Sequence, residues 1–135
     1  MLTLDRQVAD AIVAHARRDH PDEACGLVAG PEGSGRAARV IEMTNALRSM
    51  TQYEFEPAEQ RKVYRELDDR DEEVVVVYHS HTATEAYPSR TDVRHASQPQ
   101  AHYVLVSTRD PDAVELRSFR IVDGVVTEEE VRIGG

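Results

Sequence analysis

The chain contains two histidines separated by one residue, His79 and His81, and Asp92 follows after ten further residues. The histidines come directly after residues 73–78, a β-branched apolar run that predicts a strand buried on both faces. Because side chains at i and i+2 of a strand share a face, both imidazoles can reach one point about 2 Å from their nitrogens, the usual zinc–nitrogen distance. A catalytic zinc needs three protein ligands and an open position for water, so the pattern is typical of a zinc hydrolase site.

Residues 82–91 are small or polar and predict a loop that leaves the strand and returns as a helix. Ser89, directly after Pro88, is an expected helix N-cap, with the acid Asp92 three positions later. Capping therefore explains Ser89 and Asp92 without any metal, and an isolated pair of histidines at this spacing is weak evidence. Capping does not require two histidines on one strand face just upstream, however, and the joint pattern favours a metal site.

The full pattern resembles the signature of the JAMM (MPN-plus) metalloproteases: His79, one residue, His81, seven residues, Ser89, two residues, Asp92. The resemblance implies that His79, His81 and Asp92 bind one zinc ion per chain. It also implies that Ser89 stabilises the negative oxygen that develops on the substrate carbonyl. No signature position is missing, which argues against the MPN-minus relatives that keep the fold as a scaffold.

The same family has a glutamate well upstream, beside a short strand, and Glu23 matches that position in the string DEACGL at 22–27. The resemblance implies that Glu23 is the general acid/base. Chemistry alone requires only a carboxylate within hydrogen-bond reach of the reacting water, and it could not select Glu23 from 25 acidic residues. Without the resemblance, an exposed acid between a proline turn and a strand is the simpler interpretation.

Longer strings, at 15–26, 78–92 and 101–108, resemble small actinobacterial members of the family. These hydrolyse cysteine from the C-terminus of a ubiquitin-like sulfur carrier protein that ends in Gly-Gly. The resemblance implies a zinc metallopeptidase that releases cysteine in cysteine biosynthesis. A diglycine tail is physically compatible, because residues without side chains pass easily through a narrow channel and an extended tail can pair with a sheet edge.

Two alternatives remain open. The first is a deubiquitinase-like isopeptidase that acts on another ubiquitin-like conjugate, although a chain this short leaves little room for the insertions that grip ubiquitin and lysine. The second is a non-catalytic, zinc-stabilised scaffold or binding module, which the complete ligand set and Glu23 disfavour.

A chain of 135 residues is expected to form one domain, residues 1–135, and is long enough to bury a core. Hydrophobic periodicity and turn signals predict the following elements. The helices are one starting near Thr3, which is its expected cap, with Leu4, Val8, Ala11, Ile12 and His15 on one face, then 57–70 with Val63, Tyr64 and Leu67 buried, and a short one after Ser89; the strands are 24–29, 38–43, 73–78, 102–108, 114–122 and 125–133, with 49–55 extended. This mixture indicates the α+β class. The family resemblance implies a curved, mostly antiparallel sheet flanked by helices, the cytidine-deaminase-like fold.

The formal charge of −9 argues against nucleic acid as a partner, because phosphate contacts need a positive surface. The longest strongly apolar run, 74–78, is far shorter than the ~20 residues of a membrane helix. A lone cysteine, Cys25, agrees with a reducing compartment, and the N-terminus lacks signal-peptide features, so a cytoplasmic location is expected. Arg90 and Arg94 could meet a substrate carboxylate, or they could simply be exposed to solvent. Cys25 could line the cleft, or it could be a small buried side chain. The oligomeric state stays open.

Overall fold

The computed structural model describes residues 1–134 and confirms the expected α+β class. In that part of the chain a six-stranded sheet has the order β3-β2-β4-β5-β6-β7. The strands are β2 (Cys25–Pro31), β3 (Arg39–Met43), β4 (Glu72–His81), β5 (His102–Ser107), β6 (Glu115–Val122) and β7 (Val125–Glu129). β4 and β5 are parallel and all other neighbours are antiparallel, so the sheet is mostly antiparallel, as expected. Gly135, the last residue of the expected domain, lies outside the described residues.

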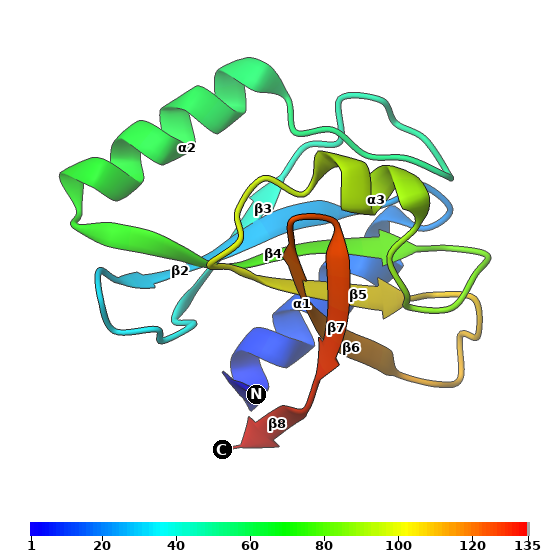
Figure 1. Ribbon diagram of the computed structural model, residues 1–135. Helices are drawn as coiled ribbons and strands as arrows, with labels where there is room; N and C mark the ends of the chain where they lie inside the picture. The colour runs from blue at the N-terminus through cyan, green and yellow to red at the C-terminus, as the bar shows by residue number, and fades with distance from the viewer. Residues whose placement is uncertain (135) are drawn as a thin grey trace.

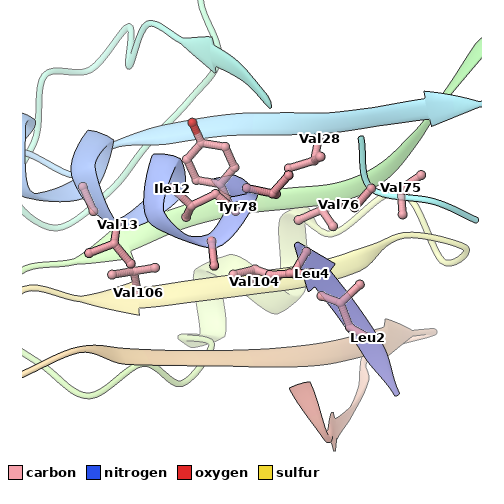
Figure 2. Packing of buried hydrophobic residues seen from close by; sticks show 14 residues of the cluster. Leu2, Leu4, Ile12, Val13, Val28, Val75, Val76, Tyr78, Val104 and Val106 are labelled. Atoms are coloured by element: carbon pink, nitrogen blue, oxygen red, sulfur yellow. The ribbon is translucent and has the colours of Figure 1, made fainter. Parts of the chain in front are cut away.

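Helices cover both faces of the sheet (Figure 1). α1 (Arg6–Asp19) packs on one face, and α2 (Pro57–Asp69) and α3 (Arg90–His95) lie over the other. Figure 2 shows the first interface, where Ile12 of α1 lies beside Tyr78 of β4 and Val13 beside Val106 of β5. α2 confirms the helix expected at 57–70. Of its expected buried side, Leu67 is buried, and Val63 and Tyr64 are partly buried against a second hydrophobic cluster, which includes Leu27 and Val77.

The start of the chain differs from the expectation. Leu2–Asp5 forms strand β1, which pairs in parallel with β8 (Val131–Gly134), so the first helix begins only at Arg6. Thr3 is therefore not the helix cap, and Asp5 occupies that position. Leu2 and Leu4, two residues apart, are both buried, and this alternation fits a strand once a partner strand is available.

Two further expectations about strands are corrected. The strand expected at 125–133 is divided into β7 and β8, which belong to different sheets. The segment 49–55 forms no strand and is a loop, apart from one bridge between Asn45 and Phe55. The hairpin expected at Asp123 and Gly124 is present, and both residues have the positive φ that a tight two-residue turn requires.

β4 lies in the interior of the sheet, between β2 and β5. The crossover from β4 to its parallel neighbour β5 contains α3, so the carboxyl ends of both strands and this helix lie at the same end of the sheet (Figure 1). No helix within residues 1–134 is both long and apolar enough to cross a membrane.

Candidate metal centre

The two histidines lie at the C-terminal end of β4, as expected from the sequence. His79 and His81 are buried and their side chains converge on one face, with the two Nε2 atoms 3.3 Å apart. Ser80 points to the other face, where its Oγ accepts a hydrogen bond of 2.8 Å from the backbone N–H of Ala24. The strand periodicity therefore brings the imidazoles together while Ser80 fastens the strand to the chain before β2.

Asp92 reaches the same point from α3. Its Oδ2 lies 3.1 Å from Nε2 of His79 and 3.1 Å from Nε2 of His81. The same oxygen accepts a 2.8 Å hydrogen bond from the backbone N–H of Ser89, and Ser89 Oγ accepts one of 3.1 Å from the N–H of Asp92. The expected cap at Ser89 is thus confirmed, and the capping box holds the Asp92 carboxylate toward the histidines. Capping and metal binding do not exclude one another here.

The spacing of the three atoms fits a zinc ion. Ligand atoms about 2.0–2.1 Å from a tetrahedral zinc are about 3.3–3.4 Å from each other. The separations among His79, His81 and Asp92 are 3.1–3.3 Å. Two imidazole nitrogens and one carboxylate oxygen are a donor set that catalytic zinc uses, with a fourth position left for water. His81 Nδ1 lies 3.0 Å from the carbonyl oxygen of Glu85, the second hydrogen bond that orients many metal-binding histidines.

The pKa shifts of Asp92 and His79 suit a cation, whereas burial would lower the pKa of His81 but its hydrogen bonds to Asp92 and to the carbonyl oxygen of Glu85 raise it. Burial alone would raise the pKa of the Asp92 carboxyl, but hydrogen bonds from His79 and His81 hold it well below its usual range. Burial lowers the pKa of His79, which favours the neutral imidazole. A neutral imidazole and an ionised carboxylate are the forms that bind metals.

Glu23 precedes β2 and faces the end of β4. The antiparallel pairing of Cys25 with His79 is continued by a 3.0 Å hydrogen bond from the N–H of Ser80 to the carbonyl oxygen of Ala24. The next residues in this register are Glu23 and His81, which places the Glu23 side chain on the histidine face. Burial raises the pKa of the Glu23 carboxyl to about 7, the nearby His81 lowers it, and Asp92 raises it. A carboxyl that titrates near neutrality can both accept and donate a proton.

Sequence reasoning missed Tyr53, which lies in the loop of residues 46–54 between β3 and α2, hereafter the 46–54 loop. Its ring stacks on the imidazole of His79, with centroids 4.4 Å apart and planes 28° from parallel. A cavity of about 180 Å³ lies between this loop and the region of α3 and is lined by Tyr53 and Asp92, among others. No local pattern pointed to Tyr53, because the contact joins a loop to a strand 26 residues away.

The other candidate residues have simpler roles. Cys25 is fully buried beside His79, and burial raises the pKa of its thiol to about 12, so it behaves as a small apolar side chain. Arg90 and Arg94 are exposed on α3. Burial is therefore the outcome for Cys25, whereas the exposure of Arg90 and Arg94 leaves their contact with a substrate carboxylate a prediction.

Comparison with known proteins gives close matches. The model of a family described as prokaryotic homologs of the JAB domain matches residues 5–122. A CysO-cysteine peptidase from Mycobacterium tuberculosis is 65% identical over 133 residues, 98% of this chain and 91% of that protein. A Desampylase from Haloferax volcanii is 31% identical over 111 residues, 78% of this chain and 80% of that protein.

Solved structures share the fold. The solution structure of a protein from Desulfitobacterium hafniense superposes with a TM-score of 0.85 at 32% identity, covering 98% of this chain and 92% of that one. The crystal structure of a JAB1/MPN domain protein from Archaeoglobus fulgidus gives a TM-score of 0.66 at 17% identity, with both chains covered completely.

Proposed function

Because the chain belongs to the prokaryotic JAB-domain family of JAMM proteins, we propose that it is a zinc-dependent peptidase acting on a sulfur-carrier conjugate. The proposed substrate is a ubiquitin-like sulfur carrier protein whose C-terminal Gly-Gly is joined to cysteine, and the product is free cysteine for cysteine biosynthesis. One observation carries the proposal: the Nε2 atoms of His79 and His81 and Oδ2 of Asp92 converge at the spacing of zinc ligands. The 65% identity to a CysO-cysteine peptidase supports the choice of substrate.

In the proposed reaction His79, His81 and Asp92 hold one zinc ion per chain. When bound there, zinc supplies Lewis acidity that lowers the pKa of water to about 7. Glu23 takes a proton from the attacking water and delivers it to the leaving amide nitrogen, for which its pKa of about 7 is suited. Water adds to the carbonyl carbon to form the new C–O bond, negative charge develops on the carbonyl oxygen, and the C–N bond to cysteine then breaks, which gives the carrier carboxylate and free cysteine.

Ser89 has capacity for a second role beyond the helix cap. The cap uses a lone pair on Oγ, which accepts from the N–H of Asp92. A hydroxyl has one donor as well, so its O–H can donate to the substrate carbonyl oxygen as negative charge develops on it.

The cavity of about 180 Å³ beside Asp92 supports the choice of a diglycine tail. It lies between the 46–54 loop and α3, where bulky side chains on a substrate would meet Tyr53. In this proposal residues 1–135 act as one catalytic domain. The cytoplasm is the proposed compartment, supported by the free thiol of Cys25.

A second candidate is an isopeptidase that removes a ubiquitin-like protein from lysine, which the 31% identity to a Desampylase favours. The two activities differ in the leaving group. In one case it is a free amino acid, and in the other it is a side-chain amine attached to a folded protein.

Zinc-loaded protein should release cysteine from a CysO–cysteine conjugate, and it should act much more slowly on a lysine-linked ubiquitin dimer at the same concentration. Intact mass spectrometry measures both reactions. Replacing the carrier's penultimate glycine by valine should nearly abolish cleavage, because a β-branched side chain would meet Tyr53 at the cavity beside Asp92. Equal or faster cleavage of the ubiquitin dimer would favour the isopeptidase. Zinc-loaded protein that cleaves neither conjugate would favour a scaffold.

Ser89→Ala should lower kcat about 100- to 1,000-fold, the usual cost of one donor to a developing oxyanion. KM and zinc content should change little, because the carboxylate of Asp92 still receives the backbone N–H of residue 89. Ser89→Thr is the matched control, since it retains both the cap and the O–H donor. If Ser89→Ala lowers only the melting temperature and leaves kcat intact, capping is the whole function of this hydroxyl.

A further inference from the structure

The 46–54 loop is closed at its base by the side chain of Asn45, which is buried. The amide uses all four of its hydrogen-bonding positions. Oδ1 accepts from the N–H of Leu47 (3.0 Å) and of Glu54 (3.2 Å), and Nδ2 donates to the carbonyl oxygens of Gln52 (3.0 Å) and Glu23 (3.0 Å). Three of these bonds hold the two ends of the loop together. The fourth leaves the loop and reaches the backbone of the proposed general acid/base.

Asn45 and the 46–54 loop together hold the backbone of Glu23 at both of its polar groups. The carbonyl oxygen of Glu23 accepts from Asn45, and its N–H donates to the carbonyl oxygen of Ser49 at 2.8 Å. The carboxyl group itself is nearly enclosed, and its Oε1 has no hydrogen-bond partner among the described residues. Because no side-chain bond from the protein orients this oxygen, the position of the carboxyl depends on how its backbone is fixed.

The same loop also orients His79. Nδ1 of His79 is buried without a hydrogen-bond partner in residues 1–134, whereas Nδ1 of His81 lies 3.0 Å from the carbonyl oxygen of Glu85. A metal-binding histidine is normally oriented by a hydrogen bond at its second nitrogen. His79 has instead the stacked ring of Tyr53, 4.4 Å away. Ring stacking thus takes the place of the missing orienting bond.

These contacts reach Glu23 and His79, the two site residues that each have a buried side-chain atom without a hydrogen-bond partner in residues 1–134. We propose that Asn45 is a positioning residue that fixes the backbone of Glu23 and, by closing the 46–54 loop, holds Tyr53 against His79. Asn45 touches neither metal nor substrate and acts through these two residues. The proposal rests on the proposed function for its effect on rate, but its effect on zinc binding does not require a substrate.

The test compares Asn45→Ala, Tyr53→Leu and Tyr53→Phe with the wild type. Ser118→Ala is the matched control. Ser118, in β6, is fully buried and donates a 2.8 Å hydrogen bond to the carboxylate of Glu129 in β7. Four quantities are measured on each protein: the zinc dissociation constant by chelator competition, kcat and KM on a CysO–cysteine conjugate, and the melting temperature.

Asn45→Ala should lower kcat about 10- to 100-fold with KM within a factor of about two, and should weaken zinc binding about tenfold, the range found for residues that orient metal ligands. Tyr53→Leu should weaken zinc binding to a similar degree. Tyr53→Phe should bind zinc as tightly as the wild type, because the ring remains. Ser118→Ala should lower the melting temperature without changing zinc affinity or kcat.

Wild-type zinc affinity and kcat in Asn45→Ala, with only the melting temperature lowered, would overturn the proposal. If Asn45→Ala does not fold, Tyr53→Leu decides, and unchanged zinc affinity there would also overturn it. A wild-type protein that leaves the conjugate intact would contradict the proposed function, while the zinc affinities of the variants would still test the positioning of His79.

Discussion

His79→Ala and His81→Ala should each yield a protein with almost no bound zinc and no measurable hydrolysis of the carrier–cysteine conjugate. Each substitution removes one of three converging ligand atoms. The two that remain cannot hold zinc against dilution and chelator as three do, and the reaction depends on the metal. Elemental analysis of purified proteins measures the zinc, with about one zinc per chain expected for the wild type. This variant pair carries the largest effect, because activity and cofactor are lost together.

His20→Ala is the matched control for this experiment. His20 is an exposed histidine whose Nδ1 lies 2.7 Å from Oγ1 of Thr108, and it has no part in the metal centre. It should retain both zinc and activity, which excludes a general effect of removing a histidine. Full zinc stoichiometry in His79→Ala and His81→Ala would show that the ligand assignment is wrong.

Glu23→Gln should keep the zinc and the fold and lose about 100- to 10,000-fold in kcat, the usual contribution of a positioned general acid/base. The amide has nearly the shape of the carboxyl but cannot take a proton from water. Because Glu23 is almost fully buried and its Oε1 has no hydrogen-bond partner within residues 1–134, a neutral side chain should leave the melting temperature unchanged or raise it. A variant with a lower melting temperature, or one without zinc, would instead indicate a structural role for Glu23.

The neighbouring acid provides the comparison for Glu23. Asp22→Asn changes charge by the same amount one residue away and should retain the wild-type rate. Single-turnover measurements with saturating enzyme separate the chemical step from product release. A normal rate in Glu23→Gln would contradict the assignment of Glu23 as the proton-transfer group, and another acid would have to serve.

Local patterns were sufficient where the physical cause is local. A β-branched run predicted β4, and period-two geometry placed His79 and His81 on one face. The cap at Ser89, the helix starting at Pro57 and the hairpin at Asp123 each depend on neighbouring residues, and each is present. Ser89 and Asp92 had two possible interpretations, capping or chemistry, and the structure shows that one carboxylate oxygen meets both the cap and the histidines.

The errors occur where distant segments compete with local preference. Leu4 was assigned to a helix capped by Thr3, because nothing nearby in the chain shows that β8 lies beside Leu2 and Leu4, some 130 residues later. The segment 49–55, most of which lies in the 46–54 loop, was expected to be extended. Its shape depends instead on the four hydrogen bonds of Asn45, which no periodicity reveals.

By itself, the sequence determined the class of fold and three atoms that can share a metal, because strand periodicity and helix capping operate over a few residues. The family signature then selected Glu23, which physical reasoning alone could not separate from the other acids. Only the tertiary structure decided how Glu23 comes to face His81, through the pairing of β2 with β4, and how Tyr53 comes to lie on His79. These contacts join residues 26 to 58 positions apart, and their geometry follows from how the sheet, the loop and the helices pack together rather than from any neighbouring residue.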